Sequence, residues 1–366
     1  MRKNNKPKYI VLAAGGTGGH IFPAQAVADF LINNHKLFLV TDQRGTKFLK
    51  GALLRAEREI LPVKGFTSSI NDKAYALTGL IFSFLKLFFM FFFKKPSIVV
   101  GFGGYLSVPA IMAAFFHQIP TIIHEQNAVM GKANKFLAKF VNAVALSFKN
   151  TLNIDGIANY KMVYTGNPIR QQVFALSDRP YKKLDKNIFK ILVVGGSQGT
   201  AIFSNTIPQA IKLLNPKIQE NLYIYQQTRQ DLLQRTVNEY QATKSKVEIE
   251  SFFEDIENLL YKCDLVITRA GAATVTEIIA LRKPSILIPF AAAQHNHQFF
   301  NAKFLSNQQA SVLIEEKDLT PNLLAKTILE LITNTEEFSR LQAAMKKIKC
   351  TNAVQILVDL ILKLKA

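Results

Sequence analysis

The chain has 366 residues, 49% of them hydrophobic and 19% charged, which is enough apolar material for about two domains and excludes a disordered chain or a coiled coil. Its two cysteines, Cys263 and Cys350, are too few for a disulfide framework or a four-ligand zinc site. The 45 Lys and Arg against 26 Asp and Glu leave a net charge of +19, so an anionic partner is expected: nucleic acid, anionic lipid or a phosphorylated substrate.

Residues 1–8 have the basic character of a signal peptide. The apolar run that follows, 9–14, is shorter than such a peptide needs and meets two glycines. No secretion signal is therefore expected.

Short apolar runs alternate with helical stretches along the chain. Residues 9–14 predict a buried strand, 15–19 a glycine turn and 20–33 a helix, and the plan recurs with a strand at 189–194 and a glycine turn at 195–199. Further strands are expected at 98–100, 121–123, 142–146, 222–225, 264–268 and 285–289. Because parallel strands need crossover helices, the order predicts an α/β fold with two doubly wound parallel-sheet domains around a shared central cleft.

A linker between the two domains is expected at 166–180, where turn residues cluster and the apolar periodicity lapses. We therefore place the N-terminal domain at 1–166 and the C-terminal domain at 167–340. A helical segment at 341–366 is expected to pack back on the N-terminal domain.

The two glycine turns, 15–19 and 195–199, stand where a strand meets a helix. Glycine lets the backbone approach a ligand closely, and the following helix N-terminus offers free N–H groups, so the pattern indicates phosphate binding. The alternative is that glycine merely makes the turn.

A nicotinamide-binding loop is the nearest rival, because Asp42 closes the run 37–41 where a ribose-binding acid is expected. The third glycine of G-x-G-x-x-G would however fall on Ile21, and the turn at 195–199 lacks the leading G-x-G. No Gly-Lys-Ser or Gly-Lys-Thr follows either turn, so a P-loop is disfavoured too.

A third loop, 269–277, follows the strand at 264–268 and opens a helix. Thr274 and Glu277 have the spacing of a capping box, in which they would satisfy free N–H groups of that helix. Alternatively, the helix N-terminus receives a diphosphate and Glu277 accepts hydrogen bonds from both hydroxyls of a ribose. The residues leave both interpretations open.

Six motifs follow one another in order: 15–20 (GGTGGH), 101–105 (GFGGY), 124–127 (HEQN), 166–170 (GNPIR), 195–199 (GGSQG) and 271–277 (GAATVTE). Together they resemble the MurG family of bacterial glycosyltransferases over about residues 9–302. The resemblance implies a GT-B fold of two Rossmann-like domains, with no cofactor and no required metal. It also implies that GlcNAc passes from UDP-GlcNAc, held by the C-terminal domain, to the muramyl C4 hydroxyl of lipid I (undecaprenyl-pyrophosphoryl-MurNAc-pentapeptide), presented by the N-terminal domain. Inversion at the anomeric carbon then yields lipid II for peptidoglycan.

The resemblance also assigns site residues by position. Near the donor sugar and its diphosphate it places Thr17, Gly18, Gly19 and Asn127; on the phosphates, Arg170 and Ser197; around the nucleotide, Ala272, Ala273, Thr274, Val275 and Thr276; on the ribose, Glu277; and on the sugar hydroxyls, Gln298. Taken singly, Asn127 also suits a turn and Arg170 a surface ion pair. Phe253 stands where the family often has an aliphatic residue beside the uracil, a change that a backbone contact would tolerate and a side-chain contact would not.

An attacking alcohol needs a base, and a departing UDP needs its charge stabilised. His20 is the first candidate base, because a helix N-terminus favours the neutral imidazole, and Glu125 is the second. For His20 the alternative is phosphate or acceptor binding without proton transfer.

Residues 76–93 form an apolar run with Lys86 as its one charge, long enough to span a bilayer. Spanning would put the first loop and the strand at 98–100 on opposite sides, so a helix lying in the membrane interface, flanked by Lys94 and Lys95, is expected, with a buried core helix as the alternative. Lys132, Lys135 and Lys139 recur at helical spacing and favour docking on anionic lipid over a merely solvated face. The expected location is peripheral, on the cytoplasmic face of the inner membrane.

Two rival classes remain open. One is a GT-B enzyme on another acceptor, such as a glycolipid synthase or a nucleotide-sugar epimerase. The other is a nucleic-acid binder, which the dispersed basic residues and the lack of a zinc-finger, RNP or basic-zipper pattern disfavour. His295 and His297 lack a third ligand, so no metal site is expected.

Overall fold

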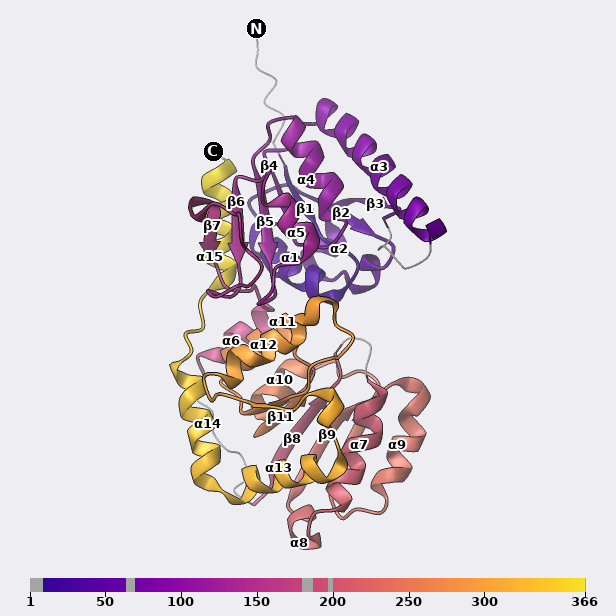
Figure 1. The fold of residues 1–366 in the computed structure, drawn as a ribbon, viewed down its shortest axis with the longest axis vertical. Helices are drawn as coiled ribbons and strands as arrows, with labels where there is room; N and C mark the ends of the chain where they lie inside the picture. Colours follow the sequence, from indigo (N-terminus) through magenta and orange to yellow (C-terminus); the bar gives the residue numbers. More distant parts are fainter. Residues whose placement is uncertain (1–8, 64–69, 180–186, 197–199, 366) are drawn as a thin grey trace. The chain divides into compact units, whose positions relative to one another are not determined.

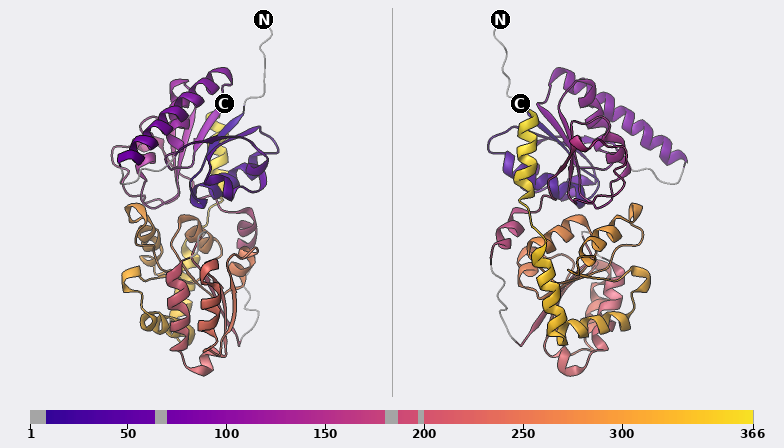
Figure 2. Two further views of the ribbon diagram at one scale, coloured as in Figure 1. Left: turned by 90° about the vertical axis from the view of Figure 1, so that its right-hand side faces the viewer. Right: turned by 60° about the vertical axis from the view of Figure 1, so that its left-hand side comes forward.

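The computed structural model describes residues 9–63, 70–179, 187–196 and 200–365 (Figure 1). The chain divides by its internal packing into two compact units: unit 1 contains Met1–Arg170 and Thr351–Ala366, and unit 2 contains Gln171–Cys350. Each unit is built on one parallel sheet with helices on both faces (Figure 2). The predicted α/β class with two doubly wound parallel sheets is confirmed.

In the described part of unit 1, seven strands form one sheet in the order β3-β2-β1-β4-β5-β6-β7. The strands are β1 (Ile10–Ala13), β2 (Leu37–Asp42), β3 (Glu57–Leu61), β4 (Ile98–Gly101), β5 (Thr121–Glu125), β6 (Ala143–Leu146) and β7 (Met162–Tyr164). The helices are α1 (Gly18–Leu31), α2 (Gly51–Arg55), α3 (Ile70–Phe93), α4 (Ser107–Phe116), α5 (Lys132–Leu137) and α15 (Ala353–Lys365), with 3-10 helices η1 (Gly45–Phe48) and η2 (Asn159–Lys161). Because β1, β4 and β5 are neighbours and parallel, the loops after them meet at one edge of the sheet.

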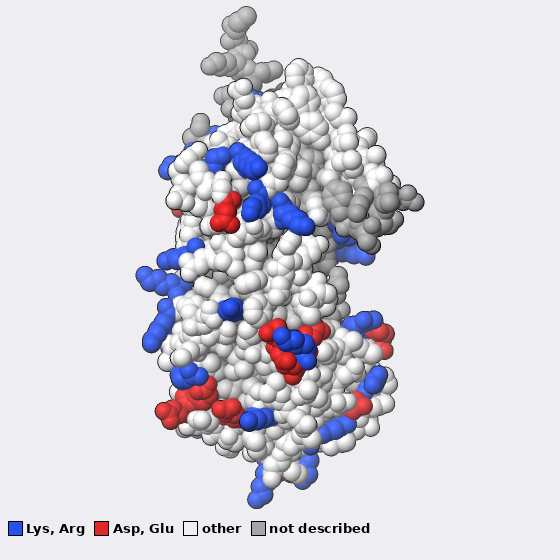
Figure 3. Space-filling model, in the orientation of Figure 1, with Lys and Arg blue, Asp and Glu red and all other residues white. Residues whose placement is uncertain are grey.

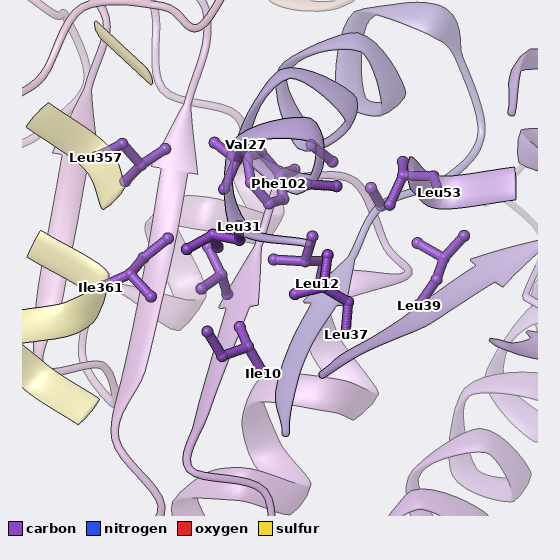
Figure 4. Packing of buried hydrophobic residues seen from close by; sticks show 14 of the residues in the cluster. Ile10, Leu12, Val27, Leu31, Leu37, Leu39, Leu53, Phe102, Leu357 and Ile361 are labelled. Atoms are coloured by element: carbon purple, nitrogen blue, oxygen red, sulfur yellow. The ribbon is translucent and has the colours of Figure 1, made fainter. Parts of the chain in front are cut away.

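Alternation along β1 sends its side chains into two cores. Ile10 and Leu12 pack with α1, α2 and α15, whereas Val11 and Ala13 pack with α3 and α4. A strand buried on both faces needs apolar residues at successive positions, which explains the unbroken apolar run of β1. Leu357 and Ile361 of α15 belong to the same buried cluster as Ile10 and Leu12 (Figure 4), so this helix completes the core of unit 1.

The predicted C-terminal segment, 341–366, is divided between the units. Helix α14 (Thr335–Lys347) contributes Leu341 to the core of unit 2, and only α15 belongs to unit 1. The segment that leaves unit 1 contains Gly166, and the segment that returns begins at Thr351. Gly166 has a φ of +77°, and a Cβ on it would lie 2.5 Å from Thr351 Oγ1. Glycine is therefore required where the outgoing and returning segments lie against each other.

In the described part of unit 2, six strands form a sheet in the order β10-β9-β8-β11-β12-β13. They are β8 (Phe189–Val194), β9 (Leu222–Gln227), β10 (Lys246–Glu250), β11 (Leu265–Thr268), β12 (Ser285–Leu287) and β13 (Val312–Leu313). The remaining helices are α6 (Gln171–Ser177), α7 (Ala201–Lys212), α8 (Pro216–Gln219), α9 (Leu233–Tyr240), α10 (Ile256–Lys262), α11 (Ala272–Ala280), α12 (His297–Ser306) and α13 (Pro321–Thr333), with 3-10 helices η3 (Gln230–Leu232), η4 (Gln294–Asn296) and η5 (Glu316–Asp318).

The stretch expected to be a linker, 166–180, contains helix α6. Val173 and Leu176 of this helix are buried, and α6 contacts α10 and α11. The linker predicted at 166–180 therefore contains the boundary between the units, which lies between Arg170 and Gln171, and a short helix that packs on unit 2.

Helix α3 is apolar on nearly all sides but packs through one stripe. Its buried positions among the described side chains recur at helical spacing and are Ala76, Gly79, Ser83, Leu87 and Phe91. Residues Ala74–Phe93 are long and apolar enough to cross a membrane, yet only 28% of their most apolar window is buried. Most of this window is therefore exposed in the described part of unit 1, which disfavours the alternative of a buried core helix.

Helix α5 is shorter than the spacing of its lysines suggested. It ends at Leu137, so Lys132 and Lys135 lie on the helix while Lys139 lies beyond it. Lys135 Nζ donates to Asn153 Oδ1 at 2.5 Å. The expectation that the three lysines form one helix face was wrong.

Candidate active site

A buried carboxylate accepts hydrogen bonds from the backbone of the first glycine loop. Asp42 Oδ1, at the end of β2, accepts hydrogen bonds from the backbone N–H groups of Gly16 and Gly45, both at 2.8 Å. Its Oδ2 accepts from Arg44, whose Nη2 lies 2.9 Å away. A Cβ on Gly15 would lie 2.8 Å from Asp42 Oδ1. Asp42 thus holds the backbone of the loop in place. The sequence had suggested Asp42 as a ribose ligand.

Replacement of Asp42 by alanine is expected to destabilise the ligand-free protein by about 2–3 kcal/mol, because two N–H groups lose their acceptor. Urea unfolding measures the change, with the exposed Asp155→Ala as a matched control. An Asp42→Ala variant as stable as the wild type but defective in nucleotide binding would restore the ribose interpretation.

His20 lies in the first turn of α1, and its ring contacts the glycine loop that precedes the helix. Its Nδ1 lies 3.0 Å from the carbonyl oxygen of Gly15. A carbonyl only accepts, so Nδ1 carries the proton and Nε2 is the basic nitrogen of the neutral ring. The ring also lies beside the loop after β4, where Cβ atoms on Gly103 and Gly104 would lie 3.3 and 3.2 Å from it. The glycines of 101–105 therefore leave room for His20.

Glu125, the second candidate base, is 2% exposed at the end of β5. Its Oε1 accepts from the backbone N–H of Asn127 at 3.0 Å and from Asn127 Nδ2 at 3.3 Å. Its Oε2 accepts from Gly131 N–H at 3.0 Å and from Asn134 Nδ2 at 2.8 Å. Both oxygens therefore accept hydrogen bonds from the loop that follows β5 or from Asn134 of α5, which favours a positioning role for this carboxylate.

Gln126 and His124 join the loops after β4 and β5, a role that the sequence did not indicate. Gln126 Nε2 donates to Phe102 O at 2.9 Å and lies 3.1 Å from His124 Nδ1. Burial lowers the pKa of His124 to about 4, so its ring is neutral at pH 7 and its Nε2–H donates to Gly166 O at 3.2 Å. The backbone that borders His20 is thus fixed by buried polar groups.

In unit 2, α11 begins at Ala272 with Gly271 as its N-cap. The capping box centred on Thr274 was therefore wrong, since Thr274 lies three residues inside the helix. Gly271 has no side chain to offer to the first N–H groups, and Glu277 is 7% exposed on the next turn. Val275 is fully buried, whereas Ala273, Thr274 and Thr276 are half-buried. The start of α11 keeps the features of an anion site.

A buried arginine ties three loops of unit 2 together. Arg269, at the end of β11, donates to Pro289 O at 3.1 Å, to Thr200 Oγ1 at 3.1 Å and to Glu316 Oε1 at 2.9 Å. Its guanidinium also lies 5.3 Å from the centre of the Phe290 ring. Arg269 begins the third loop, but the residues next to it in the sequence do not predict that it bonds to three other loops.

Gln298, a predicted site residue, joins the two ends of the loop 291–298 by a hydrogen bond. Gln298 Oε1 accepts from the N–H of Phe290 at 3.0 Å, and Ala291 N–H donates to Glu316 Oε2 at 2.8 Å. His295 and Asn296 both have positive φ, of 52° and 55°. Glu316 thus links Arg269 to the start of this loop.

The remaining predicted site residues fall in different surroundings. Phe253 is buried and its ring meets Tyr225 edge-on at 6.5 Å, whereas the neighbouring Phe252 is 59% exposed. Only the backbone of Phe253 is thus left for a ligand.

Arg170 ends the first segment of unit 1 and is half-buried. Ser197 lies outside the described residues. Thr17 and Gly19 are exposed at the start of α1, and Gly18 is buried there.

Comparison with known proteins identifies this arrangement. Residues 10–146 match the N-terminal domain of glycosyltransferase family 28, and residues 190–360 match its C-terminal domain. A transferase of Zymomonas mobilis, named UDP-N-acetylglucosamine--N-acetylmuramyl-(pentapeptide) pyrophosphoryl-undecaprenol N-acetylglucosamine transferase, is 37% identical over 98% of this chain and 92% of its own. A protein of the same name from Rhodospirillum centenum is 38% identical over 96% of this chain and 93% of its own.

The crystal structure of MurG from Acinetobacter baumannii superimposes with a TM-score of 0.79 at 28% identity, covering 98% of this chain and all of that one. Two models of one family match residues 10–146 and 190–360, and a relative named for the same transfer is 37% identical over 98% of this chain. The chain therefore belongs to glycosyltransferase family 28 and, within it, to the MurG family of GT-B enzymes.

Proposed function

We propose that the protein transfers GlcNAc from UDP-GlcNAc to the muramyl C4 hydroxyl of lipid I, with inversion at the anomeric carbon, and so makes lipid II for the bacterial cell wall. The observation that carries this is the identity of 37–38% over nearly the whole chain with relatives that are named for this transfer. Unit 1 presents the acceptor and unit 2 binds the nucleotide-sugar.

His20 is the base in this proposal. Its Nδ1–H bond to Gly15 O places the lone pair of the neutral ring on Nε2, the nitrogen that accepts the proton in this proposal. Glu125 holds the loop of Asn127 in place, since four donors already occupy its two oxygens. As the acceptor oxygen attacks, its proton passes to His20 Nε2, the bond to the anomeric carbon forms, and UDP leaves with the electron pair of the broken bond.

UDP is held by the N-terminal end of α11, where the first N–H groups and the helix dipole favour the diphosphate. Glu277 accepts hydrogen bonds from the ribose, Arg170 and Ser197 meet the phosphates, and Gln298 meets the sugar hydroxyls. The exposed ring of Phe252 suits stacking on the uracil, with backbone of Phe253 beside it.

Unit 1 docks on the cytoplasmic face of the inner membrane as a peripheral protein. Along α3, large apolar side chains stay exposed: Leu77, Ile81, Phe82, Leu85, Phe89, Phe92 and Phe93. Lys86 does not interrupt them with a free charge, because its Nζ lies 2.6 Å from Glu59 Oε1. On the face of unit 1 seen in Figure 3, basic side chains gather beside the broad uncharged area over α3 and α4. An apolar surface beside basic residues suits an anionic lipid surface.

The double variant Phe82→Asp/Phe89→Asp is expected to bind vesicles of phosphatidylcholine and phosphatidylglycerol at least ~10-fold more weakly, because each phenylalanine loses apolar contact with the interface. Co-sedimentation measures binding, and high salt should release the wild type. Phe30→Asp is the matched control, since Phe30 is 48% exposed on α1, which covers the other face of the sheet. Equal loss in the control would contradict docking through α3.

Transfer of labelled GlcNAc from UDP-GlcNAc to a short-chain, water-soluble lipid I analogue, in the presence of EDTA, tests the proposed reaction. We expect an inverted, β-linked product that needs both substrates and no added metal. Release of UDP without the acceptor would favour an epimerase, and transfer only to another lipid would favour a different acceptor class. Either result would overturn the proposal.

A further inference from the structure

The loop after β4 borders the ring of His20 through two glycines. A Cβ on Gly103 would lie 3.3 Å from His20 Cδ2 and 3.4 Å from His20 Nε2, and a Cβ on Gly104 would lie 3.2 Å from His20 Cε1. Any shift of this backbone therefore changes the space in which the imidazole is held. The residues that fix the loop are candidates for control of the orientation of the ring.

Gln126, the residue after β5, reaches this loop from a neighbouring strand. Its Nε2 donates to Phe102 O at 2.9 Å. A Cβ on Gly103 would lie 3.4 Å from Gln126 Oε1, the same distance as from His20 Nε2. Gln126 is only 2% exposed, so its amide makes these contacts out of reach of solvent. One glycine thus lies against both the amide of Gln126 and the Nε2 edge of His20.

Other hydrogen bonds of the loop come from α4, which directly follows it, and from β1. Ser107 Oγ of α4 donates to Gly103 O at 2.8 Å, and Phe102 N–H donates to Ala13 O at 2.9 Å. Phe102 is fully buried, so its carbonyl oxygen is satisfied by the Gln126 amide and not by water. Loss of the amide would leave this buried acceptor without its donor and untie the loop from the end of β5.

The orientation of the Gln126 amide is itself determined by His124, which is fully buried. His124 Nε2 donates to Gly166 O at 3.2 Å, so the lone pair of the neutral ring is on Nδ1, 3.1 Å from Gln126 Nε2. Burial lowers the pKa of His124 to about 4, so Nδ1 stays an acceptor at pH 7. A flipped amide would turn its oxygen toward two acceptors, Phe102 O and His124 Nδ1. The NH₂ group of Gln126 therefore faces both, and its oxygen faces Gly103.

We propose that Gln126 is a positioning residue for the transfer reaction: it holds the loop after β4 against His20 and so keeps the ring in the orientation in which Nδ1 donates to Gly15 O. The lone pair that accepts the proton is then on Nε2. Gln126 acts through the backbone of the loop. The proposal rests on the role of His20 as base in the proposed function.

Gln126→Leu is expected to lower kcat at least ~10-fold, because small displacements of a catalytic group cost large factors in rate. The KM for UDP-GlcNAc should stay within about twofold, since the donor is bound by unit 2 in the proposed mechanism. Steady-state transfer to the soluble acceptor analogue measures both constants. Unchanged kcat would overturn the proposal.

Gln219→Leu is the matched control. Gln219 is 5% exposed in unit 2, and its Nε2 donates to Leu214 O at 2.7 Å, so the control also removes a buried amide that donates to a carbonyl. Urea unfolding should show a loss of stability in both variants, whereas kcat of the control should stay within about twofold. An equal fall of kcat in the control would overturn the proposal.

Gln126→Met keeps the test informative if leucine packs badly at this position. Methionine has nearly the shape of glutamine but no N–H group. We expect the same fall in kcat as in Gln126→Leu. Full turnover would mean that the side chain acts only by filling space, which would overturn the proposal.

A double-variant cycle tests whether Gln126 acts through His20. Gln126→Met should lower kcat at least ~10-fold when His20 is present, and by no more than about twofold in the His20→Ala background, which has no ring to position. Equal fold losses in the two backgrounds would overturn the proposal. Near-normal turnover of His20→Ala alone would overturn the assignment of the base, and the positioning proposal with it.

The ring ¹⁵N signals of His20 in the ligand-free, full-length protein test the proposal without the reaction. They are identified by their absence from His20→Gln. At about pH 8, where a free imidazole is neutral, we expect the Nδ1–H tautomer to predominate in the wild type and in Gln219→Leu, and a mixture of tautomers in Gln126→Met. An unchanged tautomer in Gln126→Met would overturn the proposal. If the wild type transfers no GlcNAc to the acceptor analogue, the proposed function fails, and these signals still decide whether Gln126 positions the ring.

Discussion

Replacement of His20 by alanine is expected to lower kcat by at least ~100-fold with only a modest change in the KM for UDP-GlcNAc. The reason is that, in the proposed mechanism, proton transfer to Nε2 takes place in the transition state, whereas the donor is bound by unit 2. Steady-state transfer to the soluble acceptor analogue measures both constants. Near-normal turnover would remove His20 from the mechanism.

His20→Gln separates proton transfer from hydrogen bonding. Its amide can still donate to the carbonyl of Gly15, as His20 Nδ1 does at 3.0 Å, but it has no basic nitrogen. We expect this variant to be as slow as His20→Ala. Recovery of most of the turnover with Gln, or a rise in KM for the acceptor alone, would mean that His20 binds substrate without accepting a proton.

Replacement of Arg269 by methionine is expected to destabilise unit 2 by about 3–5 kcal/mol, the range found when one partner of a buried ion pair is removed. Arg269 and Glu316 have side chains only 7% and 20% exposed, and the loss also leaves the oxygens of Thr200, Ile288 and Pro289 without this donor. Because these atoms belong to the loops after β8 and β12, the KM for UDP-GlcNAc should rise more than kcat falls. Urea unfolding and steady-state kinetics measure the two effects.

Arg269→Met/Glu316→Gln is the matched control, since it removes the stranded carboxylate as well. It should be more stable than Arg269→Met alone. If both variants are equally destabilised, the ion pair contributes nothing beyond packing. Arg269→Lys should rescue little, because a single ammonium cannot reach the acceptors that the guanidinium joins.

The ion pair also predicts a pH dependence. Burial alone would raise the pKa of Glu316, but hydrogen bonds from Arg269 and from Ala291 N–H, together with the guanidinium charge, outweigh it and lower the pKa. A carboxyl whose folded pKa is below the unfolded value of about 4.3 contributes fully above that value, and the contribution is lost as pH falls through the folded pKa. The difference in stability between the wild type and Glu316→Gln should therefore shrink below about pH 4.

Most of the strands that the sequence missed lie at the edges of the sheets. Predicted strands such as β1, β4 and β8 are interior. Of the strands that were not predicted, β3, β7, β10 and β13 are the edges of the two sheets, whereas β2 is interior. Edge strands are partly exposed and carry charge, as in β3 (Glu57–Leu61) and β10 (Lys246–Glu250), or are very short, as in β13 (Val312–Leu313). Their pairing depends on a neighbour that the local sequence does not reveal.

The same distinction applies to the site. Glycine turns at 15–19 and 101–105 were visible in the sequence because only glycine tolerates the positive φ and the close contacts found there. The partner of each polar side chain was not visible. Asp42 suggested a ribose ligand and proved to clamp a loop, and Glu125 suggested a base and is occupied by four donors.

By itself, the sequence determined the α/β class, the use of one plan twice and the family, since these depend on residue type and order. Only the tertiary structure decided which side of α3 stays exposed, which helix the end of the chain adds to unit 1, and which oxygen and nitrogen atoms are already satisfied. A buried polar group must find a partner, and that partner is commonly far away in the chain, as Thr200 and Glu316 are from Arg269. Such pairings depend on folding in three dimensions and leave no signal at neighbouring positions.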